Sequence, residues 1–208
     1  MSYFGIYHLK RRRRLNSAED SMLTRREFMK AGGVGLASLA IPGMSSIAIS
    51  STQGVTDIVE IHMKSDPQGS DVWFDPIGVY IEPGQTVRWI VMENVHTTTA
   101  YHPKNDMHSL RIPKGATPWN SGFLVNKGDH FDVTLTVEGV YDYFCMPHEQ
   151  AGMVGRIVVG KPVGPGALPF DYFKGEPGTS NWKPVPVAAQ KALPSVEVIM
   201  KQKIVRRV

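Results

Sequence analysis

The sequence is poor in cysteine, in long apolar runs and in repeats, and each shortage excludes a class of protein. A single cysteine among 208 residues allows no intramolecular disulfide and no zinc site built from several cysteines. No apolar run is long and unbroken enough to make a good permanent membrane span. No internal repeat and no long stretch of helical periodicity occur, so short strands become the favoured building units.

Charge is unevenly distributed, and the net charge of +4 hides segments of opposite sign. Residues 1–48 hold eight Lys/Arg against three Asp/Glu, whereas residues 57–160 hold seven against thirteen. Residues 161–208 are basic again, with eight Lys/Arg against three Asp/Glu. No basic patch interleaved with stacking aromatic residues appears, so the sequence predicts no nucleic-acid binding.

The N-terminal residues have the charge-then-apolar order of a targeting segment. Two adjacent arginines lie in Thr24–Lys30 (TRREFMK), and a Gly- and Ala-rich apolar run follows from Ala31 to about Ala48. This arrangement resembles a twin-arginine export signal, which carries folded proteins out of the cytoplasm. We therefore predict a leader over residues 1–48 and a periplasmic or otherwise extracytoplasmic location, with no stable membrane span unless the signal stays uncleaved. A basic amphipathic helix is the alternative.

Residues 57–160 are rich in short apolar alternations bounded by glycine and proline, a pattern typical of strands. We expect strands at 57–64, on both sides of a turn at Pro83–Gly84, and near 131–137, 139–144 and 155–159. Short strands joined by frequent turns predict an all-β sandwich domain. The segment between them, residues 97–130, is looser and predicts a long loop or a short helical turn.

The composition changes again over residues 161–208, where prolines become frequent. Such a segment is either an extended arm wrapped on a surface or a flexible linker. Near its end, Ser195 can cap a short helix, with Glu197 in the first helical turn. A terminal strand over Val196–Val208 is the competing interpretation. The sequence thus predicts a Pro-rich C-terminal extension ending in a short helix.

The most informative segment for function is Tyr141–Gly155 (YDYFCMPHEQAGMVG). An alternating strand ends at Cys145, a proline-stiffened turn presents His148, and a glycine-containing loop returns Met153. One thiolate, two imidazoles and a weak thioether are the donors of a blue copper site. The second imidazole must come from elsewhere in the chain, and His96, just past an expected strand, is the candidate.

The spacing Cys145-x-x-His148-x-x-x-x-Met153, preceded by an upstream histidine, is similar to that of plastocyanins, halocyanins and pseudoazurins of the cupredoxin family. The resemblance covers about residues 57–160. It implies a Greek-key sandwich with one type 1 copper ion at one end, held by His96, Cys145, His148 and Met153. It also implies redox cycling without catalytic turnover, so we predict that the protein is not an enzyme.

Other histidines compete with His96 for the fourth position. His102 is the runner-up, and His108 lies in the same loop region, which is longer than in a minimal plastocyanin. A second metal between these histidines remains an alternative, although spare loop histidines are commonly solvated. His62 and His130 lie in strand-like contexts and are expected to be structural.

The sequence therefore predicts an exported one-electron carrier that shuttles between redox partners. A cytochrome or a copper enzyme would dock on the face around His148. Two other functions stay open: a copper chaperone or storage protein, and the electron-entry subunit of a copper enzyme. The second needs additional copper sites with more histidines, and the whole chain has only seven.

Overall fold

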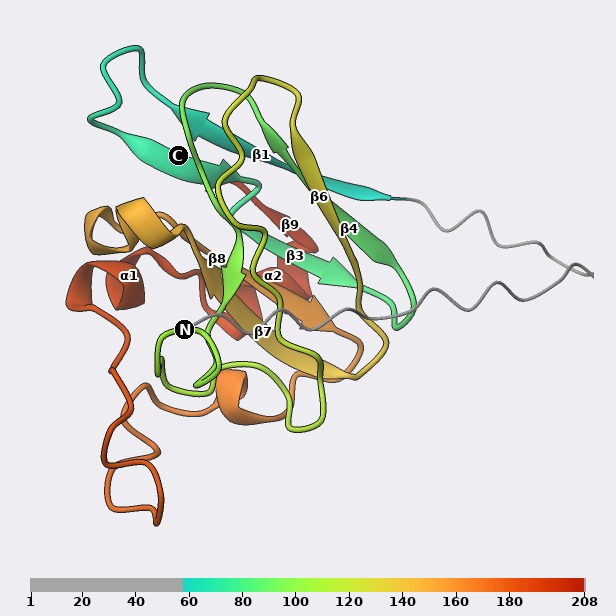
Figure 1. Ribbon diagram of the computed structural model, residues 1–208. Coiled ribbons are helices and arrows are strands. Elements are labelled where there is room, and N and C mark those ends of the chain that lie inside the picture. Colours follow the sequence, from blue (N-terminus) through green and yellow to red (C-terminus); the bar gives the residue numbers. More distant parts are fainter. Residues whose placement is uncertain (1–57, 208) are drawn as a thin grey trace, which may run out of the picture. The chain divides into compact units, whose positions relative to one another are not determined.

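The computed structural model describes residues 58–207, whose strands form two sheets (Figure 1). The first sheet has the strand order β2-β1-β4-β6, and the second has the order β5-β7-β8-β3-β9. The strands are β1 (Val59–Ser65), β2 (Val72–Asp75), β3 (Gly78–Ile81), β4 (Thr86–Val91), β5 (Thr99–Ala100), β6 (His130–Thr134), β7 (Gly139–Phe144), β8 (Val154–Val159) and β9 (Ile204–Val205). The predicted all-β sandwich is confirmed, whereas the predicted leader over residues 1–48 lies outside the described residues.

The first sheet follows the alternation that the sequence predicts. In β1, Ile61 and Met63 are buried and their neighbours are more exposed, and in β4 Trp89 is buried in the same way. These side chains meet Tyr143 and Ile157 of the second sheet in one core. Because successive strand residues point to opposite faces, the period of two is the mark of a sheet with one solvated side.

The second sheet is different, because every residue of β7 and β8 is buried. Residues 161–207 cover its outer face, as the orange and red part of the chain in Figure 1 shows. The outer contacts are Phe144 and Val154 with Val185, Ala189 and Leu193, and Val140 and Val158 with Ile199. The C-terminal arm, defined here as residues 161–207, is therefore packed on the sandwich and is not a flexible linker.

The arm contains a 3₁₀ turn and two short helices: η2 (Pro165–Ala167), α1 (Val187–Ala192) and α2 (Val196–Gln202). The hydroxyl of Ser195 accepts a hydrogen bond from the backbone N–H of Val198, which caps α2 as its sequence suggests. Strand β9 then pairs antiparallel with β3. Each of the two interpretations of residues 196–208 is correct in part, because helix α2 is followed by strand β9. The helix is therefore not the last element.

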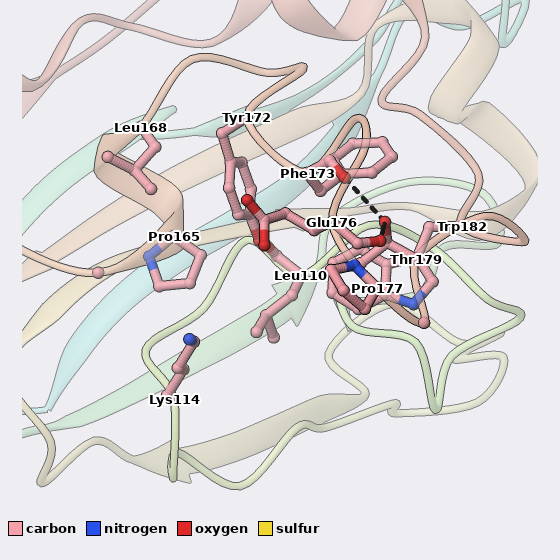
Figure 2. A pocket seen from close by; sticks show the side chains of 12 residues that line it. Leu110, Lys114, Pro165, Leu168, Tyr172, Phe173, Glu176, Pro177, Thr179 and Trp182 are labelled. Atoms are coloured by element: carbon pink, nitrogen blue, oxygen red, sulfur yellow. Dashed lines mark hydrogen bonds between the residues drawn. The ribbon is translucent and has the colours of Figure 1, made fainter.

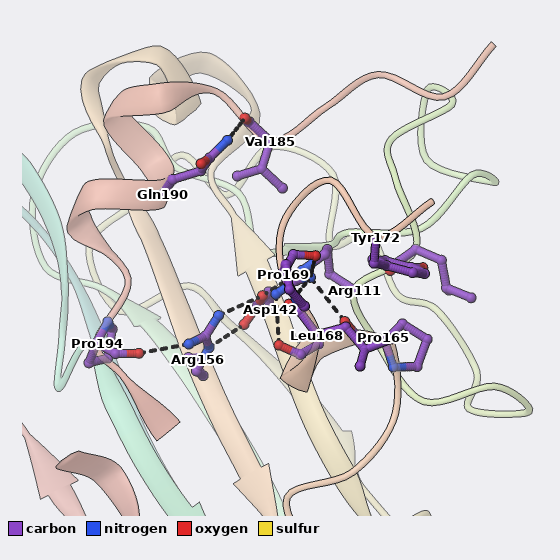
Figure 3. A network of polar contacts seen from close by, with 12 residues as sticks. Arg111, Asp142, Arg156, Pro165, Leu168, Pro169, Tyr172, Val185, Gln190 and Pro194 are labelled. Carbon is purple, nitrogen blue, oxygen red and sulfur yellow. Dashed lines mark hydrogen bonds and ion pairs between the residues drawn. The ribbon is translucent and has the colours of Figure 1, made fainter. Parts of the chain in front are cut away.

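A buried ionic network joins the arm to the second sheet (Figure 3). Asp142 of β7 is fully buried between two arginines, with Arg111 Nε 3.0 Å and Arg156 Nε 2.7 Å from its carboxylate oxygens. Arg156 Nη2 also donates to Asp142, at 3.0 Å. Other guanidinium N–H groups donate to arm carbonyls, at Pro165, Gly166, Leu168, Pro169 and Pro194. Buried charges persist only when paired and hydrogen-bonded, and here the arm supplies many of the acceptors.

Two features depart from the sequence-based prediction. Strand β2 was not predicted, because its four residues are too few for alternation to be recognised between a turn and Pro76. The segment 97–130 is mostly irregular, but it contains β5 and isolated bridges at His96–Leu124 and Thr99–Asn120. Over residues 58–207, no helix has the length and apolar character needed to span a bilayer.

Candidate metal centre

The thiol of the candidate site lies where β7 ends and a tight loop begins. Cys145 precedes the 3₁₀ helix η1 (Met146–Ala151), which ends at Gly152 in the left-handed conformation with φ 85°. The backbone N–H of Cys145 donates to the Met153 carbonyl at 3.0 Å, and that of His148 donates to the Cys145 carbonyl at 3.0 Å. These bonds close the loop at its base and fix the positions of the residues on it.

The second histidine comes from the loop after β4. The backbone of His96 forms a pair of hydrogen bonds with Leu124, with N···O distances of 3.1 and 2.9 Å. Before it, Asn94 adopts a positive φ of 56°, and its side-chain amide donates to Ser65 Oγ at 2.6 Å. Asparagine tolerates this conformation better than most residues, so the sharp bend that delivers His96 has a local cause.

Three candidate donor atoms converge at this end of the sandwich. Cys145 Sγ lies 3.7 Å from His96 Nδ1 and 3.4 Å from His148 Nδ1. The ligand atoms of the three residues all lie within 4.8 Å of one another, and they are the one such group of His, Cys, Asp and Glu in residues 58–207. The centroids of the His96 and His148 imidazole rings are 5.2 Å apart. A soft sulfur with two ring nitrogens at this separation fits a copper ion.

Thr97 binds both the thiol and the backbone at the start of the loop. Its backbone N–H donates to Cys145 Sγ at 3.3 Å, and its hydroxyl accepts from the backbone N–H of Met146 at 2.8 Å. Donors aimed at the sulfur stabilise its thiolate form. Sequence reasoning missed Thr97, although its place directly after a candidate ligand was a usable signal.

Burial governs the protonation of the free site. Removal from water raises the pKa of the Cys145 thiol to about 11, although the bonds from Thr97 act in the opposite direction. Burial, and next the neighbouring His148, lowers the pKa of His96 to about 4. Burial also lowers the pKa of His148. Both imidazoles are therefore neutral at pH 7, the form in which they donate to a metal.

Met153, the fourth predicted ligand, is fully buried and belongs to the same core cluster as Cys145. Its backbone N–H donates to the His148 carbonyl at 3.1 Å, so the loop carries all three residues in a fixed relation. Cys145, His148 and Met153 thus lie on one short loop that backbone hydrogen bonds close.

The competing histidines lie elsewhere. His102 is partly exposed and its Nδ1 accepts from the backbone N–H of Lys104 at 3.0 Å, outside the three-residue group. His108 is buried, with Nε2 3.2 Å from a carboxylate oxygen of Glu149. His130 is exposed on β6. The structure therefore favours His96 over His102 for the metal group.

The comparisons with known proteins agree with this site. A family model for copper binding proteins of the plastocyanin/azurin family matches residues 61–160. A pseudoazurin of Methylorubrum extorquens is 29% identical over 117 residues, covering 55% of this chain and 71% of its own. A plastocyanin of Scenedesmus fuscus is 29% identical over 104 residues, covering 48% of this chain and 99% of its own. Residues 61–160 of this chain therefore belong to the cupredoxin family.

Among solved structures, the native pseudoazurin of Hyphomicrobium denitrificans has 24% sequence identity and a TM-score of 0.45, covering 65% of this chain and 92% of that one. Copper is the cofactor of the cupredoxin, and the thiol and imidazoles described above suit it. The protein is a copper electron carrier.

One cavity of the cupredoxin lies apart from the metal site. It has a volume of about 670 Å³ and lies between the C-terminal arm and the segment 110–114 (Figure 2). Leu110, Tyr172 and Trp182 contribute to its lining, and none of the four predicted copper ligands does.

Proposed function

We propose that this cupredoxin is an exported one-electron carrier with a single type 1 copper ion held by His96, Cys145, His148 and Met153. The convergence of the Cys145 sulfur with two imidazole nitrogens within 4.8 Å is the observation that carries the proposal. When bound, copper supplies the redox couple. The protein contributes donors that its backbone has fixed in advance, so the site rearranges little between oxidation states.

The electron leaves, we propose, through His148. Its imidazole is partly exposed, whereas His96 and Cys145 are fully buried. Beside it lies a hollow of about 320 Å³ lined by Val95, Phe123 and Pro147 among others. An apolar rim around one exposed ligand suits a brief encounter with a redox protein, because such interfaces are small and easily desolvated. A cytochrome or a copper enzyme would fit this face.

Two further functions find less support. An electron-entry subunit of a copper enzyme needs additional metal clusters, and residues 58–207 contain one group of three metal-binding side chains. A chaperone or storage protein needs ligands that exchange readily, whereas Cys145 is fully buried and the loop is closed by backbone hydrogen bonds. The residue arrangement therefore favours transfer of electrons over transfer of copper.

The export part of the proposal depends on the twin arginines of Thr24–Lys30, which lie outside the described residues. A periplasmic or other extracytoplasmic location is proposed on that motif. Replacing Arg25 and Arg26 together by Lys should keep the protein in the cytoplasm of a host with a twin-arginine pathway. Fractionation that still finds it outside the cytoplasm would refute the export route.

Absorption spectroscopy tests the ligand set. The copper(II)-loaded native protein should show an intense visible band from sulfur-to-copper charge transfer, and Cys145→Ser should lose it because an oxygen donor cannot supply that transition. His130→Ala, which changes an exposed histidine outside the group, should keep the band. Copper content is measured alongside. A strongly coloured Cys145→Ser protein with normal copper content would rule out the assignment.

A further inference from the structure

A buried contact next to the candidate copper loop involves a histidine that the metal group leaves unused. His108 is 7% exposed and comes from the loop between β5 and β6. Its Nε2 lies 3.2 Å from Glu149 Oε2, and Glu149, directly after His148 in η1, is itself only 8% exposed. A charged side chain this deeply buried beside a ligand requires a partner, and His108 provides it.

The hydrogen bonds of His108 define how its ring is held. Its Nδ1 lies 2.7 Å from the backbone carbonyl of Asn105, and its Nε2 faces the carboxylate of Glu149. Both ring nitrogens therefore have an oxygen partner, and the ring is fixed at two points. Such a doubly bound imidazole cannot rotate without breaking a buried hydrogen bond.

His108 also contacts the residue on the other side of the loop. Its ring packs on Phe144 with centroids 4.4 Å apart and on Tyr101 with centroids 5.6 Å apart. Phe144 is the residue directly before Cys145. His108 thus packs on Phe144, which precedes Cys145, and binds Glu149, which follows His148.

The C-terminal arm anchors the loop that carries His108 through backbone hydrogen bonds. The backbone around it pairs with Lys183, through Ser109 N–H to the Lys183 carbonyl at 2.9 Å and Lys183 N–H to the Met107 carbonyl at 2.7 Å. The loop that carries His108 is therefore anchored to the arm, and the arm is in turn bound to the sheet through Asp142.

We propose that His108 is a positioning residue for the copper loop, which fixes His148 through Glu149 and Cys145 through Phe144. The proposal rests on the ligand roles of His148 and Cys145 given above. A loop held from this side keeps the donor geometry constant between oxidation states. Loss of the contact frees the loop and leaves the Glu149 carboxylate without its partner, which favours copper(II) over copper(I) and speeds copper release.

Three variants separate this role from a general effect on packing. His108→Phe keeps an aromatic ring against Phe144 and removes both hydrogen bonds. His108→Gln restores an N–H donor toward Glu149. His102→Phe is the matched control, because His102 lies in the same loop region, is partly exposed and bonds only to the Lys104 backbone.

Two quantities are measured on copper-loaded protein at pH 7: the ratio of oxidised to reduced copper in equilibrium with a redox mediator, and the rate of copper release to a chelator. His108→Phe should raise both at least twofold. His108→Gln should return both toward the native values, and His102→Phe should leave them unchanged. The proposal is overturned if His108→Phe changes both less than twofold, if His108→Gln is as altered as His108→Phe, or if His102→Phe shifts them equally.

If His108→Phe does not fold, Glu149→Leu takes its place, because it removes the oxygen that His108 binds and keeps a side chain of similar size. A change of less than twofold in both quantities then overturns the proposal. Failure of the ligand assignment would be recognised differently, because the native copper(II)-loaded protein would then lack the intense visible band. In that case both the proposed function and the positioning role fall.

Discussion

His96 and His102 are six residues apart in one loop region, yet the structure gives them different surroundings. His96 is fully buried beside Cys145, and His102 is partly exposed and bound to a backbone N–H. We expect His96→Ala to abolish the intense visible band and His102→Ala to keep it, because only the first removes a nitrogen near the sulfur. Absorption of both copper-loaded variants decides between them, and the reverse result would move the ligand role to His102.

Residue identities were the most predictable part of the site. The spacing of Cys145, His148 and Met153 on one loop was readable because loop closure depends on local sequence. His96 could be ranked above His102 only by its place after a strand. Thr97 was missed although it directly follows His96. The contact between His108 and Glu149 could not be predicted, because it depends on how two loops far apart in sequence meet.

At the scale of elements, the C-terminal arm differs most from what its composition suggests. Frequent prolines left open a linker or a wrapped arm, and no sequence signal identifies the surface that the arm covers. The fully buried pattern of β7 and β8 shows why the arm is needed: without it, Phe144, Val154 and Val158 would face water. A truncation before residue 164 is therefore expected to lose stability.

The ionic network in Figure 3 attaches the arm to the second sheet, and a substitution of Asp142 tests its contribution to stability. Asp142→Asn removes the charge that holds both Arg111 and Arg156 in a buried position. Breaking a buried ion pair by changing one partner costs about 3–5 kcal/mol. We expect the free energy of unfolding to fall by about that amount, measured by denaturant titration.

Asp132→Asn is the control for that measurement. Asp132 forms a two-point bond with Arg88 on the exposed side of the first sheet, where ion pairs contribute about 1 kcal/mol or less. Equal losses of stability in Asp132→Asn and Asp142→Asn would contradict the idea that burial makes the network important.

At the scale of the whole molecule, the acidic sandwich and the basic arm partly neutralise each other. Arg206 and Arg207 at the end of the arm pair with Asp75 and Asp71, at 2.5 and 2.6 Å. Burial tends to raise the pKa of Asp75, but its bonds to Lys64 and Arg206 outweigh that effect and the pKa is lowered. The charge reversal visible in the sequence therefore becomes contact between the arm and β2.

The lowered pKa of Asp75 sets the direction of a pH effect. A carboxylate with a depressed folded-state pKa stabilises the fold above its unfolded pKa of about 3.9, and this contribution is lost as pH falls through the lower folded value. Asp75→Asn should therefore reduce stability at pH 7 by about 1 kcal/mol or less and have a smaller effect near pH 2. Thermal unfolding at the two pH values measures this. An equal loss at both would show that charge is not the cause.

Several exposed apolar residues lie around His148 and form a docking face for a redox partner in the proposed function. Phe123 is 62% exposed, Val95 39% and Met146 37%. Phe123 and Val95 line the same hollow as His148, and Met146 lies on the same loop. Ala151 is exposed on this loop as well. Small redox interfaces depend on close approach over such apolar surface, since electron exchange requires the exposed ligand to come near the partner.

A charge placed on this face should therefore slow electron exchange without disturbing the copper site. We expect Phe123→Glu and Ala151→Glu each to lower the second-order rate with a native redox partner at least tenfold, while the visible band stays in place. Val137→Glu is the control, because Val137 is also exposed and apolar but precedes β7, at the opposite end of that strand from Cys145. Stopped-flow mixing gives the three rates. If Val137→Glu slowed exchange as much as the other two, the partner would not be docking at His148, and the electron would have to leave through a different face.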